Sequence, residues 1–438
     1  MQTHFTPTQL ADPHLREADS ILRTCVHCGF CLSNCPTYAL LGDERDSPRG
    51  RIYLIKDMLE SGGPARPAAV THVDRCLSCL GCLTACPSGV DYMHLVDQAR
   101  THIEKTFRRP LPERMLRQIL LWVIPRPALF RLSLLLGWPF RWMHRVVPGR
   151  LGRMLETMPG RFDSPSPIHA PQVFAAEGPR RRRVALLTGC VQTVLGTRIN
   201  EATSRVLRRQ GCEVVVARGA GCCGALAQHM GRDAEAQDYA RANVRAWNDA
   251  GVDTVVINAS GCGTTVKDYG HLLASDPGLA ATAAAIATKT KDVTELLIEL
   301  GVHRAISPPK GVAIAYHDSC SLQHGQRITR EPRALLANAG FTVRDVGEAQ
   351  YCCGAAGTYN ILQPAISDQL GKRKTANLLA TGATAMACAN LGCMLHLSRF
   401  SDLPMVHTIE LLDWAAGGPV PAALARQQET AREPAPAS

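Results

Sequence analysis

A chain of 438 residues is long enough for two or three domains with full-sized cores. Its N-terminus is polar and lacks the apolar segment of a secretory signal, so we expect a reducing, cytoplasmic setting, where 18 cysteines bind metal or do redox chemistry rather than form disulfides. The net charge of +10 would suit nucleic acid, but only 5% of the residues are aromatic and no nucleic-acid-binding motif occurs. We therefore predict no nucleic-acid partner.

Two cysteine runs near the N-terminus, CVHCGFCLSNCP and CLSCLGCLTACP, share the spacing CxxCxxCxxxCP. In bacterial ferredoxins with this spacing, three cysteines hold one [4Fe-4S] cluster and the fourth crosses to the other. The rule assigns Cys25, Cys28, Cys31 and Cys86 to cluster 1, and Cys76, Cys79, Cys82 and Cys35 to cluster 2. Two structural zinc sites are the alternative, but zinc has no use for a crossing fourth cysteine.

The segment between the runs predicts a helix, because DSPRGRIYLIKDMLES offers Ser47 as an N-cap and Pro48 at the first helical position. Residues 1–106 are therefore predicted to form a helical ferredoxin-type domain with two [4Fe-4S] clusters. Within this helix, Arg49 and Arg51 either offset the negative charge of a cluster or are ordinary surface charges.

Residues 107–183 mix Leu, Trp and Arg, with frequent prolines, and hold much of the excess positive charge. Their uncharged stretches are too short to span a membrane. We predict short helices that either lie at a membrane surface or pack on a partner subunit or on the chain's own domains. The segment FDSPSPIHAPQVFAAEGPRRRR then predicts an exposed linker.

After Arg183 the pattern becomes α/β and occurs twice. Short β-branched runs end at cysteines in both copies, and the separations between these cysteines agree to within one residue. We predict two duplicated domains, the first half at residues 184–305 and the second half at 306–416, followed by a disordered tail at 417–438. The fold class is thus α+β and multi-domain.

Each half brings four cysteines to the carboxyl ends of strands, where α/β sheets usually build their sites. These cysteines are a possible further cluster site: Cys190, Cys222, Cys223 and Cys262 in the first half, and Cys320, Cys352, Cys353 and Cys393 in the second. The stretch GAGCCG in the first half matches a dinucleotide fingerprint, but the second half lacks its first two glycines and no acidic strand end follows. Cys212 and Cys388 lie outside the repeat and are predicted to be buried small apolar residues.

A two-cluster ferredoxin module followed by two CCG domains resembles a known superfamily of iron–sulfur proteins. Its members include the iron–sulfur subunits of bacterial glycolate oxidase and of anaerobic glycerol-3-phosphate dehydrogenase, lactate-utilisation proteins and heterodisulfide reductase. Within this superfamily, CVHCGFCLSNCPTYALLGDERDSPRGRIYLIK, NASGCGTTVKDYGHLL and NLGCMLHL are most similar to the glycolate oxidase type. Ala259 and Asn390 replace the first cysteine of a CxxC ending that binds clusters in the heterodisulfide-reductase type.

The resemblance implies an electron-transfer subunit of a glycolate-oxidising complex, without a catalytic residue of its own. Partner subunits with FAD would oxidise glycolate to glyoxylate, and electrons would pass through both clusters to an acceptor, expected to be membrane quinone. The resemblance also implies a cytoplasmic location, peripheral on the inner membrane. The alternatives are a subunit of a glycerol-3-phosphate or lactate dehydrogenase, a thiol or disulfide reductase, and a non-catalytic scaffold.

Overall fold

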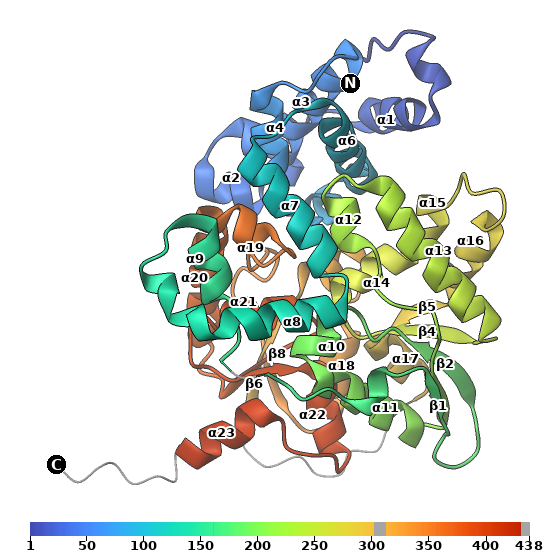
Figure 1. The fold of residues 1–438 in the computed structure, drawn as a ribbon, viewed down its shortest axis with the longest axis vertical. Helices are drawn as coiled ribbons and strands as arrows, with labels where there is room; N and C mark the ends of the chain where they lie inside the picture. Colours follow the sequence, from blue (N-terminus) through green and yellow to red (C-terminus); the bar gives the residue numbers. More distant parts are fainter. Residues whose placement is uncertain (161, 302–311, 431–438) are drawn as a thin grey trace.

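The structure is a computed structural model that describes residues 1–160, 162–301 and 312–430. A helical N-terminal part is followed by two α/β parts, so the predicted α+β class is confirmed. In Figure 1 the N-terminal part lies at one end of the molecule, and the two α/β parts lie below it.

The N-terminal part is built from six α-helices, of which the first four begin at prolines. Ser47 caps α3 by accepting a hydrogen bond from the Gly50 N–H, and Pro48 is the first helical residue, as predicted. Buried Leu22, Ile55 and Leu95 belong to its core. The helices are α1 (Pro13–Thr24), α2 (Pro36–Leu41), α3 (Pro48–Ser61), α4 (Pro67–Asp74), α5 (Gly81–Ala85) and α6 (Tyr92–Thr106).

The Leu, Trp and Arg segment forms short helices, as predicted: α7 (Leu111–Val123), α8 (Pro127–Gly137), η4 (Trp138–Arg145) and α9 (Gly149–Glu156). Leu120 and Leu121 pack into the core of the first half. Within the described part of the chain, no single helix has the length and apolar composition to cross a bilayer. Only the pair Leu111–Val123 and Pro127–Arg145, bent by 119°, meets these criteria together.

The first half holds a five-stranded sheet in the order β1-β3-β2-β4-β5. All neighbours pair in parallel except β1, which is antiparallel to β3. The strands are β1 (Gln172–Phe174), β2 (Arg182–Leu186), β3 (Cys212–Val216), β4 (Thr254–Ile257) and β5 (Thr290–Asp292). Around them lie α10 (Gln192–Leu195), α11 (Thr197–Arg209), α12 (Ala225–His229), α13 (Asp233–Asp249), α14 (Ser260–Lys267), α15 (Tyr269–Leu272), α16 (Ala280–Lys289) and α17 (Val293–Glu299).

The second half holds a parallel four-stranded sheet in the order β7-β6-β8-β9, which repeats the order β3-β2-β4-β5 of the first. Its strands are β6 (Ala313–His317), β7 (Thr342–Arg344), β8 (Ala385–Cys388) and β9 (Met405–His407). Its helices are η6 (Ser321–Gly325), α18 (Glu331–Asn338), α19 (Tyr359–Leu362), α20 (Pro364–Leu379), α21 (Leu391–Leu397), α22 (Thr408–Ala415) and α23 (Ala422–Thr430). The predicted duplication is therefore confirmed.

The two halves pack through α11 and α22. Leu186 of the first half and Tyr316 of the second belong to one shared apolar core. At its edge, buried Asp413 forms ion pairs with Arg205 and Arg209 at 2.7 and 2.8 Å. The shared core fixes the position of one half relative to the other.

The structure differs from the sequence-based expectation in two places. The predicted exposed linker contains β1, whose backbone completes the edge of the first sheet. The predicted disordered tail contains α23, and Leu424 of this helix is buried in the shared core. Both segments are rich in Pro, Ala or polar residues, and it is docking onto an existing core that orders them. Residues 431–438 lie outside the described residues.

Candidate metal centres

The two N-terminal cysteine runs form loops that turn through left-handed backbone. His27 and Gly29 in the first loop have φ of 56° and 88°, and Ser78 and Leu80 at the matching places of the second have 49° and 61°. Three of these four residues carry a side chain, so each costs on the order of 1 kcal/mol or more of strain. Such strain at matching positions indicates that loop shape serves a function.

The four thiols predicted for cluster 1 line one cavity: Cys25, Cys28, Cys31 and Cys86. Cys82 of the other set also lines it, so the two sets adjoin. Cys28 is exposed, and the apolar side chains of Val26 and Phe30 beside it are 68% and 65% exposed. The cavity lined by the thiols predicted for cluster 1 thus lies at the protein surface.

The four thiols predicted for cluster 2 are all buried: Cys35, Cys76, Cys79 and Cys82. The Ser78 N–H and the Tyr92 hydroxyl donate to the Cys76 Sγ at 3.5 and 3.7 Å. Hydrogen bonds of this kind to cysteine sulfurs help to set the potential of iron–sulfur clusters. Both thiol sets therefore fit [4Fe-4S] clusters in number and in surroundings.

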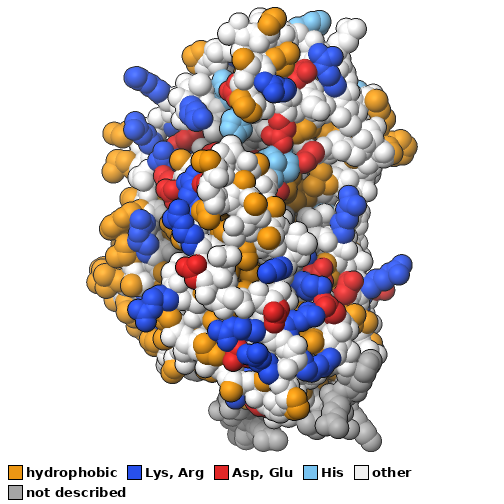
Figure 2. Space-filling view, turned by 90° about the vertical axis from the view of Figure 1, so that its right-hand side faces the viewer, with side chains coloured by type: hydrophobic (Ala, Val, Ile, Leu, Met, Phe, Trp, Pro, Cys, Tyr) orange, Lys and Arg blue, Asp and Glu red, His pale blue; other side chains and the backbone are white. Residues whose placement is uncertain are grey.

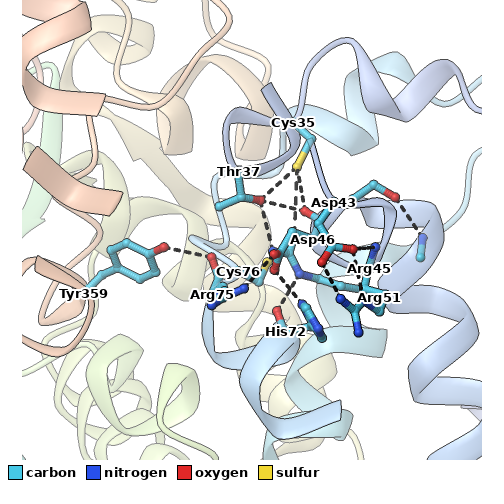
Figure 3. Close-up of polar contacts among 12 residues, drawn as sticks. Cys35, Thr37, Asp43, Arg45, Asp46, Arg51, His72, Arg75, Cys76 and Tyr359 are labelled. Atoms are coloured by element: carbon cyan, nitrogen blue, oxygen red, sulfur yellow. Dashed lines mark hydrogen bonds and ion pairs between the residues drawn. The ribbon is translucent and has the colours of Figure 1, made fainter. Parts of the chain in front are cut away.

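A buried cation lies beside the cluster 2 thiols (Figure 3). The Arg51 side chain is 2% exposed and donates to the Thr37 hydroxyl at 3.0 Å and to the His72 carbonyl at 2.7 Å. Its Nη1 lies 3.9 Å from the Cys35 Sγ. Arg51 also pairs with the buried Asp46 carboxylate at 3.4 Å, so its charge is shared between this carboxylate and the neighbouring thiols. Of the two roles open from the sequence, burial excludes a surface charge and leaves the first, to offset negative charge near a cluster.

Charge distinguishes the thiols of this set. Burial raises the pKa of Cys76, but the positive charges of Arg51 and Arg100 outweigh burial, so the pKa lies below its ordinary value. Burial raises the pKa of Cys79 and Cys82 well above the usual range. The sequence offered no signal for Arg100, whose contact with Cys76 depends on the packing of α6.

The cysteines of the first half cluster at the carboxyl ends of β2, β3 and β4, as the sequence predicts: Cys190, Cys222, Cys223 and Cys262. Gly224, which follows the pair, has φ of 87°, and a Cβ there would lie 3.0 Å from the Ala236 carbonyl oxygen. Its N–H donates to the Cys222 Sγ at 3.5 Å. The glycine lets the paired cysteines approach α13 closely.

The second half repeats this arrangement with Cys320, Cys352, Cys353 and Cys393. The Sγ atoms of Cys320 and Cys352 are 3.8 Å apart. Gly354 has φ of 92°, and a Cβ there would lie 2.6 Å from the Ser367 carbonyl oxygen. In both halves, glycine therefore follows the paired cysteines because a side chain at that position would crowd a backbone carbonyl oxygen.

One cysteine group of the second half packs against the thiols predicted for cluster 2. Cys79 packs in one apolar cluster with Cys352, and Cys320 packs against it. The Tyr359 hydroxyl donates to the Arg75 carbonyl at 2.9 Å, which ties α19 to the N-terminal part (Figure 3). The buried thiol set thus faces the second half directly.

The polar residues near the paired cysteines differ between the halves. In the first half, the Asn243 side chain donates to the Cys222 carbonyl at 2.8 Å. At the matching place of the second half stands Lys374, 2% exposed, whose Nζ donates to the Glu348 carbonyl at 2.6 Å. Asn390, which replaces the absent CxxC cysteine, donates to the Cys393 Sγ at 3.3 Å. The two cysteine groups are therefore not chemically equivalent.

A histidine pair joins the N-terminal part to the first half. His94 places Nδ1 2.7 Å from Asp91 and Nε2 3.0 Å from Asp268. Its ring stacks on His271 at 3.6 Å, and His271 contacts Glu17 at 2.7 Å. Burial opposes protonation of His94, but hydrogen bonds to the two aspartates outweigh burial and raise its pKa to about 10.

This contact predicts a loss of stability in alkali. The pKa of His94 is higher in the folded protein than in the unfolded chain, where it is about 6.5. Protonated His94 therefore contributes its full stabilisation below pH 6.5, and this contribution is lost as the pH rises towards about 10. Between pH 7 and pH 10, the melting temperature should therefore fall by about 2 °C or more further in the wild type than in H94Q. The exposed-histidine variant H14Q should follow the wild type. Equal falls in H94Q and the wild type would contradict the assignment.

Comparison with known proteins agrees with this geometry. Residues 21–90 match the family model described as 4Fe-4S dicluster domain, and residues 184–267 and 314–398 match the one described as Cysteine-rich domain. A crystal structure of a hypothetical protein from Helicobacter pylori shares the fold, with a TM-score of 0.52, 10% identity, and coverage of 84% of this chain and 73% of that one.

Three relatives differ in how much of the chain they match. The glycolate oxidase iron-sulfur subunit of Escherichia coli (strain K12) is 41% identical over 95% of this chain and 99% of its own. The probable glycolate oxidase iron-sulfur subunit of Bacillus subtilis (strain 168) is 34% identical over 90% and 94%. Lactate utilization protein A 1 of Bacillus cereus (strain AH820) is 29% identical over only 53% of this chain and 98% of its own.

Proposed function

The chain belongs to the family of glycolate oxidase iron–sulfur subunits, and from this membership we propose how its residues relay electrons from glycolate oxidation. Cys25, Cys28, Cys31 and Cys86 would hold cluster 1, and Cys76, Cys79, Cys82 and Cys35 would hold cluster 2. The clusters supply one-electron transfer, whereas a flavin collects two electrons at once. Partner subunits carrying FAD would convert glycolate to glyoxylate.

One observation carries this proposal: the two thiol sets adjoin, and they differ in depth. The thiols predicted for cluster 1 (set 1) lie at the surface beside exposed Val26 and Phe30. The thiols predicted for cluster 2 (set 2) are buried beside Arg51. A partner can approach set 1, while water is excluded from set 2. This arrangement suits a relay with a surface entry and an interior step.

The function is tested with the native complex, purified anaerobically. Glycolate should bleach the visible absorption of the clusters, whereas the chain separated from its flavoprotein should not respond to glycolate. Bleaching by glycerol 3-phosphate or lactate in place of glycolate would assign the chain to another dehydrogenase. If the separated chain reduced disulfides when given reduced ferredoxin, the chain would be a reductase and not an electron relay.

We further propose that the protein is cytoplasmic and binds the inner membrane peripherally, where a quinone would accept the electrons. The helices α7 to α9 carry exposed apolar side chains, among them Trp122, Leu136, Trp138 and Trp142. These helices face the viewer in Figure 1, and that face forms the left edge of Figure 2, where hydrophobic side chains gather beside Lys and Arg. Trp and Leu beside Arg is the composition of interfacial helices.

Membrane binding is tested by sedimentation with anionic lipid vesicles. The double variant L136D/W142D should bind about tenfold or more weakly, since each buried apolar side chain contributes about 1.5–3 kcal/mol. The control L379D changes an exposed leucine on α20 and should bind like the wild type. If the double variant bound vesicles like the wild type but no longer bound the flavoprotein, this surface would be a subunit interface instead.

A further inference from the structure

A second kind of donor set lies beneath the cysteine group of the second half. A ring nitrogen of His317 and the Sγ atoms of Cys388 and Cys393 all lie within 4.8 Å of one another, and all three residues are buried. His317 is 2% exposed, and among the described residues its Nε2 has no hydrogen-bond partner. An unpaired buried nitrogen is costly, so it indicates a ligand that the protein residues do not supply.

The first half has no such donors at the matching positions. His317 stands three residues before Cys320, and Leu187 stands three before Cys190. Cys388 stands five residues before Cys393, and Ile257 stands five before Cys262. Leu187 and Ile257 are buried in the core of the first half, so the fold needs only apolar side chains there.

A fourth donor stands next to this set. Cys353 and Cys393 interact directly through their side chains, and Cys353, Cys388 and Cys393 belong to one apolar cluster with Met386 and Leu397. The Asn390 amide donates to the Cys393 Sγ, as an outer-shell group would. Cys353 thus adds a third thiol beside the three mutually close donors, in a buried and largely apolar setting.

We propose that His317, Cys353, Cys388 and Cys393 form a structural zinc site. Four buried sulfur and nitrogen ligands are the ligand type and number of structural tetrahedral zinc. Binding would convert three thiols to thiolates and release three protons to solvent, leaving a net charge of −1 on the site. Lys374, which interacts electrostatically with Cys353, offsets that charge. The metal would join β6, β8 and the CCG loop beside cluster 2.

The test is the zinc content of the full chain, purified anaerobically and dialysed against a chelator. We expect about one zinc per chain. The variants H317L and C388I each install the residue of the first half, so the core stays apolar. Each should lose most of its zinc and keep the iron of the wild type. The control C212A removes another fully buried strand cysteine and should keep its zinc.

A second measurement needs no variant. X-ray absorption at the zinc edge of the wild type should show one nitrogen and three sulfur ligands. A wild type without zinc would overturn the site, as would four sulfur ligands. The zinc site would also be ruled out if H317L and C388I kept their zinc, or if these variants lost iron and not zinc.

Discussion

The variant C79S is expected to lose cluster 2 and to stop electron transfer from glycolate. Cys79 is buried among apolar side chains, so no water can replace the missing ligand, and serine binds iron weakly. The iron content should fall by about half, since each cluster holds four irons. The rate of glycolate-dependent reduction of the acceptor should fall more than about 100-fold, beyond the 10- to 100-fold cost typical of outer-shell changes.

The control for this experiment is C212S. Cys212 is fully buried in β3, away from both thiol sets, so this variant tests whether loss of any buried thiol unfolds the protein. C212S should keep its iron and its rate. If C79S also kept both, Cys79 would not be a ligand, and the set of four cysteines assigned to cluster 2 would be wrong.

The variant R51Q is expected to lower the reduction potential of cluster 2. Arg51 brings a buried positive charge to within 3.9 Å of the Cys35 Sγ, and a reduced cluster carries one more negative charge. At a separation of roughly 7 Å and an effective dielectric constant of about 20, one charge changes the energy by about 2 kcal/mol. For one electron this corresponds to about 100 mV. A redox titration followed by electron paramagnetic resonance measures the shift.

Two matched variants separate charge from packing. R49Q removes a neighbouring arginine that pairs with Glu44 and whose side chain is 31% exposed, so its shift should be less than about 30 mV. R51K keeps the charge at the buried position and should restore most of the potential. If the shift in R51Q were no larger than in R49Q, or if R51K did not restore the potential, the Arg51 charge would not set the potential of cluster 2.

Local signals in the sequence predicted much of this fold. Pro48 after Ser47 marks the start of α3 because a capped helix with proline at its first position has few alternatives. The repeated cysteine separations predicted the duplication because each strand of a parallel sheet ends at the same edge. β1 and α23 were missed, since each gains its stability from the core on which it docks.

The candidate site was predictable to the same extent. Cysteine spacing identified the two thiol sets because one loop must supply three ligands. It could not place Arg100 beside Cys76 or His317 beside Cys388, since these contacts join separate elements. Cys388 is buried, as predicted, but its surroundings include a histidine and not only apolar side chains.

We propose that the eight N-terminal cysteines hold two clusters, and we expect no cluster at the CCG cysteines because Ala259 and Asn390 each replace one ligand. This proposal is tested by counting iron and acid-labile sulfide per chain after anaerobic purification. About eight of each are expected. About sixteen of each would contradict this proposal, because the CCG cysteines would then bind clusters despite Ala259 and Asn390. A count near zero would show that the chain holds no clusters and cannot relay electrons through them.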